Sequence, residues 1–301
     1  MAGVRDRQAA ERWICAHVGP TGPLETVHER PWSTVLRVPL ADGAAWFKAC
    51  GASQAFEPRL SAELFARWPD RVAEVLACDE ERAWLLLGDA GAPIGAFGNP
   101  PEAWLEILPL YAELQRGEAV HASDHITRGV PSLPVSTLPL RYAHLLDREL
   151  PLEPDELARL RAFSAEFEEL CDELAAAGLP STLQHDDLHM ANVYEHGGRL
   201  RVLDWGDSSI SHPFFSLVVT FRFLEERTGL EPGDRWFARV RDAYLEPWGN
   251  GLRDVFDLAL RVGSFAHPMA WARLREFLSP AQRTTFDRAF ARILRRAIQL
   301  T

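Results

Sequence analysis

The stretch from residue 183 to residue 207 constrains this chain more than any other part of it. It begins Leu-Gln-His-Asp-Asp-Leu-His and ends Leu-Asp-Trp-Gly-Asp. Asp187 stands five residues before Asn192, and a strand-like run over 200–203 leads directly into Asp204 and a turn. A strand that ends in a polar turn holds the side chains at its end in a defined place. The order therefore predicts that carboxylate and amide oxygens gather at one point of the fold.

Phosphoryl transfer from ATP needs this kind of oxygen-rich site. A carboxylate accepts the proton of the acceptor hydroxyl, and further oxygen ligands hold Mg²⁺ against the phosphates. The order resembles the catalytic loop of protein kinases followed by their metal-binding Asp-Phe-Gly turn. Here His-Asp-Asp stands in place of His-Arg-Asp, and Asp-Trp-Gly stands in place of Asp-Phe-Gly.

A closer resemblance is to the aminoglycoside phosphotransferase family, which includes choline-kinase-like enzymes. It rests on His-x-Asp-Leu-His-x-x-Asn at residues 185–192 and on Leu-Asp-Trp at residues 203–205. The resemblance implies an α+β, two-lobed protein-kinase-like fold with ATP and Mg²⁺ between the lobes. It also implies that Asp187 is the catalytic base and that Asn192 and Asp204 are the metal ligands.

The positive charges of the chain single out one residue. Of 32 lysines and arginines only Lys48 is a lysine. A chain with this bias uses arginine wherever a positive charge suffices, so position 48 needs what a planar guanidinium does not supply. A compact ammonium is a common partner of nucleotide phosphates. We therefore expect Lys48 to contact the phosphates of ATP.

The residues of the first third of the chain favour β-strands. β-Branched and aromatic residues predict a hairpin over 25–38, and an Asp-Gly turn precedes a third strand over 44–50. Two further strands are expected over 72–78 and 83–87. These segments predict a five-stranded antiparallel lobe, with Lys48 on its third strand.

A helix is predicted over 56–68 and carries two candidate partners for the lysine, Glu57 and Glu63. Kinases place a glutamate on the helix after the third strand, where it anchors the lysine. The spacing is closer to the family pattern for Glu57, which we therefore choose. An exposed helix charge is the alternative for either residue.

The resemblance implies three further contacts with the nucleotide. Ser33 lies in the turn between the first two strands, which covers the phosphates in the family, although this turn contains no glycine. Leu87 and Asp89 lie at the expected hinge, where main-chain groups meet the adenine edge. The alternative for the hinge is an ordinary glycine-rich loop.

Beyond residue 101 the pattern is mainly helical, so we expect an N-terminal nucleotide-binding lobe over 1–90 and a helical lobe over 91–301. The helical lobe carries the catalytic loop and the acceptor pocket. Aromatic residues are candidates for the lining of that pocket, although each one fits an ordinary core position as well: Trp236, Tyr244, Trp248, His267 and Trp271.

Two positions depart from the family pattern. Asp186 stands where the family commonly has a small glycine, and it adds a second carboxylate beside the expected base. It can raise the pKa of Asp187 or attract a cation, or do neither if it points to solvent. Further on, residues 215–217 read Phe-Ser-Leu, where the family often has Asp-Leu-Ala. Any bracing by that aspartate must therefore be absent or replaced.

Composition limits the partners and the compartment. The net charge of −11 argues against nucleic acid and suits a cationic hydroxyl acceptor. The four cysteines form no CxxC pair, which fits a reducing cytoplasm. The sequence has neither a signal peptide nor an apolar run long enough to cross a membrane, so no membrane partner is expected.

Two other functions remain open on sequence grounds. The first is a catalytically silent nucleotide-binding or regulatory module, because a fold can outlive its chemistry. The second is a metal-dependent hydrolase that uses His185, Asp186, Asp187 and His189 as ligands, although it leaves Lys48 unexplained. No GxxxxGK[ST] pattern occurs, which excludes a P-loop nucleotide site.

Overall fold

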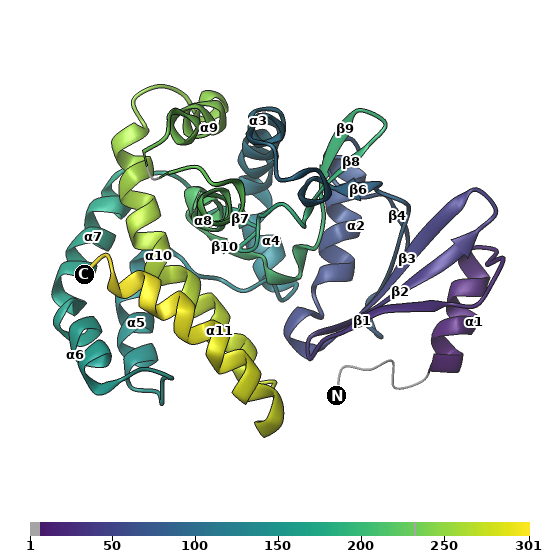
Figure 1. The fold of residues 1–301 in the computed structure, drawn as a ribbon, viewed down its shortest axis with the longest axis horizontal. Helices are drawn as coiled ribbons and strands as arrows, with labels where there is room; N and C mark the ends of the chain where they lie inside the picture. The colour runs from purple at the N-terminus through teal and green to yellow at the C-terminus, as the bar shows by residue number, and fades with distance from the viewer. Residues whose placement is uncertain (1–6, 232) are drawn as a thin grey trace. The chain divides into compact units, whose positions relative to one another are not determined.

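The computed structural model describes residues 7–231 and 233–301 (Figure 1). Its internal contacts divide the chain into two compact units. The β-rich unit comprises the residues up to Gly98 together with Met190–Gly206, and the helical unit comprises Asn99–His189 together with Asp207–Thr301. No helix among the described residues is long and apolar enough to cross a membrane.

The β-rich unit is built on a five-stranded antiparallel sheet with the strand order β1-β2-β3-β5-β4. Its strands are β1 (Glu25–Glu29), β2 (Ser33–Leu40), β3 (Gly43–Cys50), β4 (Val75–Asp79) and β5 (Trp84–Leu87). The helices of this unit are α1 (Arg7–His17) and α2 (Glu57–Arg67), with short 3₁₀ turns at Ala52–Gln54 and Ile94–Phe97. The predicted five-stranded lobe is confirmed.

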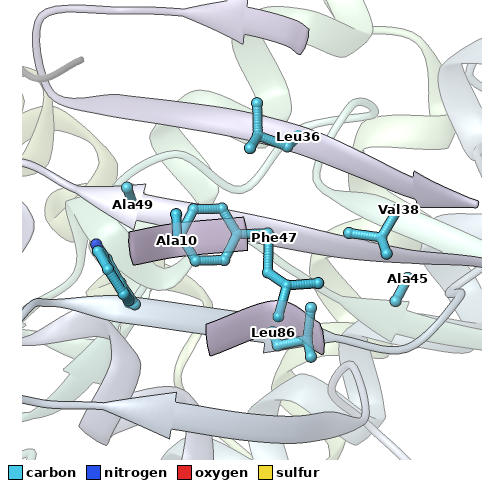
Figure 2. Packing of buried hydrophobic residues seen from close by; sticks show 9 residues of the cluster. Ala10, Leu36, Val38, Ala45, Phe47, Ala49 and Leu86 are labelled. Atoms are coloured by element: carbon cyan, nitrogen blue, oxygen red, sulfur yellow. The ribbon is translucent and has the colours of Figure 1, made fainter. Parts of the chain in front are cut away.

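One face of this sheet forms a core with α1, and Figure 2 shows Phe47 within the cluster. Successive side chains of a strand point to opposite faces. On β3, Phe47 belongs to the core face and packs edge-on against Trp84 of β5, with the ring centroids 5.6 Å apart. Lys48 is the next residue along β3, so it projects from the face opposite α1. The alternation of apolar residues thus directs the single lysine away from this core.

The segment Met190–Gly206 belongs to the β-rich unit because it pairs with it. It forms the hairpin of β8 (Val193–His196) and β9 (Arg199–Val202), and β6 (Ala92–Pro93) pairs with β8. Gly91 precedes β6 with φ +85°, and a Cβ there would lie 2.0 Å from the Glu195 carbonyl oxygen. This pairing is why the observed division differs from the expected lobes 1–90 and 91–301.

The helical unit contains nine α-helices among the described residues and one two-stranded sheet, β7 (Thr182–Gln184) with β10 (Ser209–Ser211). The helices are α3 (Pro101–Glu118), α4 (Ala122–Thr127), α5 (Leu138–Leu146), α6 (Pro154–Ala162), α7 (Ser164–Ala176), α8 (Ser216–Thr228), α9 (Arg235–Leu245), α10 (Arg253–Arg275) and α11 (Pro280–Ile298). Short 3₁₀ turns of this unit lie at Ala119–His121, Val135–Thr137, Pro213–Phe215 and Glu246–Trp248, and the turn Trp205–Asp207 spans the boundary between the two units in the sequence. The predicted two-lobed α+β fold is confirmed.

Candidate phosphoryl-transfer site

Lys48 of β3 is held between two carboxylates in the β-rich unit. Its side chain is 7% exposed, and its Nζ lies 2.6 Å from Glu57 Oε2 and 2.5 Å from Asp204 Oδ1. Glu57 is the first residue of α2, and Asp204 follows β9. Three segments far apart in the sequence thus meet at one ammonium group.

The charges of this cluster stabilise one another. Burial alone would lower the pKa of Lys48, but Asp204 and Glu57 outweigh it and hold that pKa well above its ordinary value. Burial raises the pKa of Glu57 and exceeds the opposing effect of Lys48. The Cys50 thiol donates a hydrogen bond to Glu57 Oε2 at 3.3 Å. The site therefore keeps Lys48 charged despite its burial.

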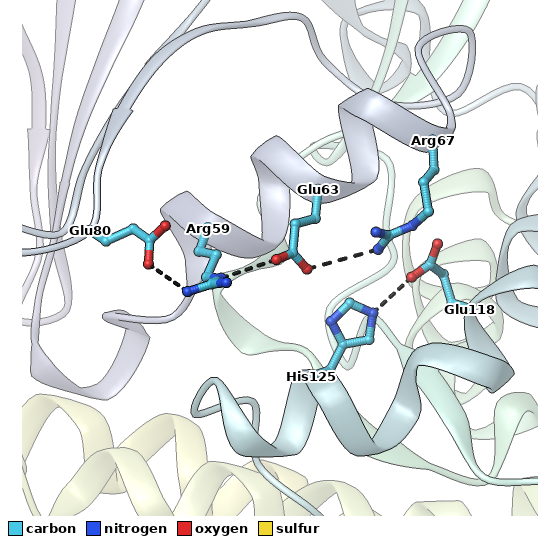
Figure 3. Close-up of polar contacts among 6 residues, drawn as sticks. All are labelled: Arg59, Glu63, Arg67, Glu80, Glu118 and His125. Carbon is cyan, nitrogen blue, oxygen red and sulfur yellow. Dashed lines mark hydrogen bonds and ion pairs between the residues drawn. The ribbon is translucent and has the colours of Figure 1, made fainter.

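Glu63, the alternative partner of the lysine, lies in a different ion-pair network (Figure 3). Its carboxylate is 3.0 Å from Arg59 Nε and 4.0 Å from an Arg67 nitrogen, and Arg59 also contacts Glu80. Of the two glutamates on α2, the structure therefore pairs Glu57 with Lys48.

The Asp-Trp-Gly turn is shaped by close contact with this cluster. Asp204 adopts a left-handed conformation, with φ +64°. A Cβ at Gly206 would lie 2.6 Å from both Glu57 Oε2 and the Gln54 side chain. Only glycine leaves room for that approach, so the turn and the carboxylate partner of Lys48 depend on each other.

Asn192 and Asp204 are adjacent in the β-rich unit because they flank the hairpin of β8 and β9, whose strands pair with each other. The Leu203 amide donates to the Asn192 carbonyl at 2.9 Å. The Asp204 side chain is 49% exposed, whereas Asn192 is buried. One carboxylate and one amide oxygen fit Mg²⁺, which takes few protein ligands and completes its shell with phosphate oxygens and water.

The alternative of a metal-dependent hydrolase needs a cluster of metal ligands. No group of three His, Cys, Asp or Glu side chains arranged for a metal occurs among residues 7–231 and 233–301, which gives the hydrolase interpretation no support.

Asp187 lies in the helical unit, after β7. Its Oδ2 is 3.3 Å from His189 Nε2, and its amide donates to His185 Nδ1 at 3.3 Å. The His189 ring stacks on Phe223 of α8, with the centroids 4.5 Å apart. His189 is thus a packed support for the carboxylate.

The loop that carries Asp187 is anchored through the buried His185. The His185 amide donates to the Tyr111 hydroxyl at 3.0 Å and to Ser216 Oγ at 3.1 Å. Gln115 Nε2 of α3 donates to the Leu183 carbonyl at 3.0 Å. Ser216 lies in the Phe-Ser-Leu stretch that replaces the family's Asp-Leu-Ala, so a serine supplies a brace at this point. No sequence signal identified Tyr111, Gln115 or Ser216, because these contacts join segments with no common motif.

Asp186 is buried and does not point to solvent. Its φ of +61° lies in the left-handed region, which explains why a glycine suits this position. The Ser209 hydroxyl of β10 donates to Asp186 Oδ2 at 2.8 Å. Burial raises the pKa of Asp186 to about 6 against the hydrogen bonds of Gln184 and Ser209. The side chain therefore braces β10 at the cost of a charge that is unfavourable at neutral pH.

Asp186→Asn is expected to stabilise the protein at neutral pH. The folded pKa lies above the unfolded value of 3.8, so the wild-type protein loses stability as the pH rises from about 4 to above 6. Asparagine keeps an acceptor for Ser209 and tolerates positive φ. The gain should be near zero below pH 4 and about 2–3 kcal/mol above pH 7. Urea unfolding across this range measures it, with the exposed Asp172→Asn as control, and a gain independent of pH would contradict this account.

The remaining candidate residues occupy defined places. Ser33 begins β2 and is buried, and its carbonyl accepts from the Arg30 amide at 2.7 Å. Leu87 ends β5 and lines a small cavity together with Asp204. The exposed Asp89 accepts from the Gly91 amide at 2.9 Å. All of these contacts lie within the β-rich unit.

The aromatic residues considered for an acceptor pocket are mostly packing residues. Tyr244 is fully buried and donates to Gln115 Oε1 at 2.6 Å, and Trp248 packs edge-on against Phe214. Trp271 stacks on Phe286 of α11. Helical amphipathicity explains these positions, so the core interpretation holds for them and not the pocket interpretation.

The fold is kinase-like: the β-rich unit carries a five-stranded sheet with a buried Lys–Glu pair, and the helical unit carries the loop with Asp187. The model of the phosphotransferase enzyme family matches residues 60–255, more than half of the chain, and the chain belongs to this family. The family match indicates a phosphotransferase. Lys48 and Glu57 precede the matched range, so their pairing is an independent finding.

Solved structures of similar fold include small-molecule kinases. Choline kinase from Streptococcus pneumoniae is 13% identical, with 95% of this chain and 98% of that chain covered and a TM-score of 0.64. The GDP complex of aminoglycoside 2'-phosphotransferase-IIIa is 14% identical, with 98% and 99% covered and a TM-score of 0.66. Amicoumacin kinase in complex with AMP-PNP, Ca²⁺ and Ami is 13% identical, with 97% and 94% covered and a TM-score of 0.57. A comparison with curated proteins finds no match.

Proposed function

We propose that this protein transfers the γ-phosphoryl group of ATP to a hydroxyl group of a small molecule, with Mg²⁺ bound. The observation that carries the proposal is the buried Lys48 held between Glu57 and Asp204. Glu57 holds the buried ammonium in place, and the half-exposed Asp204 beside it is the proposed metal ligand, which is the arrangement that a lysine in contact with phosphates needs. The nucleotide and Ca²⁺ in the amicoumacin kinase complex are in line with this chemistry.

In the proposed reaction Lys48 binds phosphate oxygens of ATP, and Glu57 fixes the lysine. Asn192 and Asp204 would hold Mg²⁺, and the bound metal would neutralise negative charge on the phosphates. The bond between the γ-phosphorus and the β–γ bridging oxygen breaks, and a bond to the acceptor oxygen forms. Asp187 orients the acceptor hydroxyl and takes up its proton, and ADP leaves.

Three further residues complete the nucleotide site in this proposal. Ser33 contributes at the turn over the phosphates, and the main chain at Leu87 and Asp89 meets the adenine edge. All three belong to the same unit as Lys48. We also propose that the protein acts in the cytoplasm, because its four cysteines are free thiols. The net charge of the chain favours a cationic acceptor.

Calorimetric titration with ATP, with and without Mg²⁺, tests this proposal. We expect tight binding that requires Mg²⁺ in the wild-type protein. Asp204→Asn removes the charged metal ligand and should abolish the dependence on Mg²⁺, while Asp70→Asn, which changes an exposed carboxylate of the same unit, should keep it. Binding that is indifferent to Mg²⁺ would favour a catalytically silent nucleotide-binding module. No binding under either condition would refute the kinase proposal.

A further inference from the structure

A cavity of about 210 Å³ lies in the helical unit, between α5 and α10. Buried apolar side chains form part of its wall, among them Leu133, Leu145 and Met269. The other lining residues are polar and charged, and most of them carry a positive charge: Arg141, His144, Arg148, Arg273 and Glu276. The volume is below that of a typical site for a drug-sized ligand, so it suits a small group.

The charge of this lining is opposite to that of the whole chain. Three arginines face one carboxylate, and that carboxylate, Glu276, is paired with Arg148 at 3.0 Å. The lining therefore has a formal excess of two positive charges in a protein whose net charge is −11. Ligand preference follows the local field of a concave site more closely than the net charge of the protein.

One of these arginines is fixed in place by the protein. Arg141 Nε donates to Thr137 Oγ1 at 3.2 Å, and its Nη2 donates to the Ser132 carbonyl at 2.8 Å. A guanidinium that is already oriented loses little entropy when it binds an anion, and its planar fork matches carboxylate and phosphate oxygens. The guanidinium of Arg141 is thus preorganised to bind an anionic group in the cavity.

The same cavity is linked to the catalytic loop within the helical unit. The Leu133 amide donates to the Ile210 carbonyl of β10 at 2.8 Å, and the neighbouring Ser209 donates to Asp186. The positive charge of Arg273 acts on Asp186 and lowers its pKa in opposition to burial. Asp186 directly precedes Asp187, the proposed base. Arg273 therefore lies close enough to the loop that carries Asp187 for its charge to act there.

We propose that this cavity binds a carboxylate or phosphate group of the acceptor, so that the substrate is a small hydroxyl-bearing anion. This inference rests on the proposed phosphotransferase function. It replaces the cationic acceptor that the net charge favours, because the arginines of the cavity would repel a cation. Arg141 and Arg273 bind the anionic group, and the hydroxyl of the same molecule is presented to Asp187.

Binding and turnover measurements on the full chain with matched ligands test this inference. The probes are glycerate, glycerol 3-phosphate, glycerol and choline, each titrated with ATP absent, and each then assayed as acceptor with ATP and Mg²⁺. We expect both anions to bind, glycerol and choline to bind at least tenfold more weakly, and the tighter of the two anions to identify a carboxylate or a phosphate site. Equal binding of all four probes, or preference for choline, would overturn the inference.

Variants locate the anion. Arg141→Gln and Arg273→Gln should each weaken anion binding at least tenfold, and Arg288→Gln, an exposed arginine of α11, should leave it unchanged. Arg141 is exposed, so its replacement leaves folding intact even if that of Arg273 does not. Anion binding that is unaffected by Arg141→Gln would contradict the assignment. ATP and Mg²⁺ should bind all three variants as they bind the wild-type protein, and loss of nucleotide binding in the wild-type protein itself would refute the kinase proposal and not the anion site.

Discussion

Asp187→Asn is expected to lower the rate of phosphoryl transfer by about 10²–10⁴-fold, the usual contribution of a positioned acid or base. The change removes a charge but keeps the size of the side chain and an oxygen near His189 Nε2. Since Asp187 has no role in holding the nucleotide, the affinity for ATP and Mg²⁺ should stay within about twofold of wild type. Single-turnover kinetics and calorimetry on the same preparation measure the two effects separately.

Asp172→Asn provides the control for this variant, because Asp172 is an exposed carboxylate on α7 of the same unit. It should change neither transfer nor binding. An equal loss of transfer and nucleotide affinity in Asp187→Asn would show that Asp187 is structural. Wild-type transfer in that variant would remove the aspartate from the mechanism altogether.

Lys48→Arg should weaken both ATP binding and turnover, although it keeps the positive charge. Nζ of Lys48 lies within 2.6 Å of two carboxylates at a position that is 7% exposed, and a guanidinium is larger and planar. Misplaced buried polar contacts cost about 1–3 kcal/mol, which corresponds to roughly a 5- to 150-fold loss. Calorimetric ATP titration and initial rates measure the loss, and urea unfolding shows whether the fold is retained.

Arg37→Lys tests the specificity of that result. Arg37 lies on β2 of the same sheet and forms a surface ion pair with Glu25 at 3.2 Å, so the exchange should have no measurable effect on binding. If the Lys48→Arg variant turned over at the wild-type rate, that result would contradict the argument that the single lysine of the chain was retained for its ammonium group.

The local sequence pattern was sufficient to predict most of the β-rich unit. The five strands, their antiparallel pairing and the place of Lys48 on β3 follow from alternation and from the Asp-Gly turn, because period two decides which face each side chain takes. The spacing of Glu57 and Glu63 on one helix was less decisive. Only the docking of α2 beside β3 put the first of them within 2.6 Å of the ammonium.

The helical unit was less predictable, because the same amphipathic pattern describes a core residue and a residue that lines a pocket. Tyr244 and Trp271 were considered for the acceptor site and are packed against other helices. No motif in the sequence singled out the arginines on α5 and α10. Their charges converge only when two helices more than a hundred residues apart pack together.

The sequence by itself indicated the family and predicted the roles of the stretch 183–207 and of Lys48, since these predictions depend on residue types at short spacing. The tertiary structure decided which carboxylates meet the lysine, that Asp186 is buried as a brace, and that Ser216 anchors the loop. It also decided the sign of the charge around the cavity in the helical unit. The physical reason is that electrostatic interactions and steric fit depend on distances in space, which the order of residues along the chain does not contain.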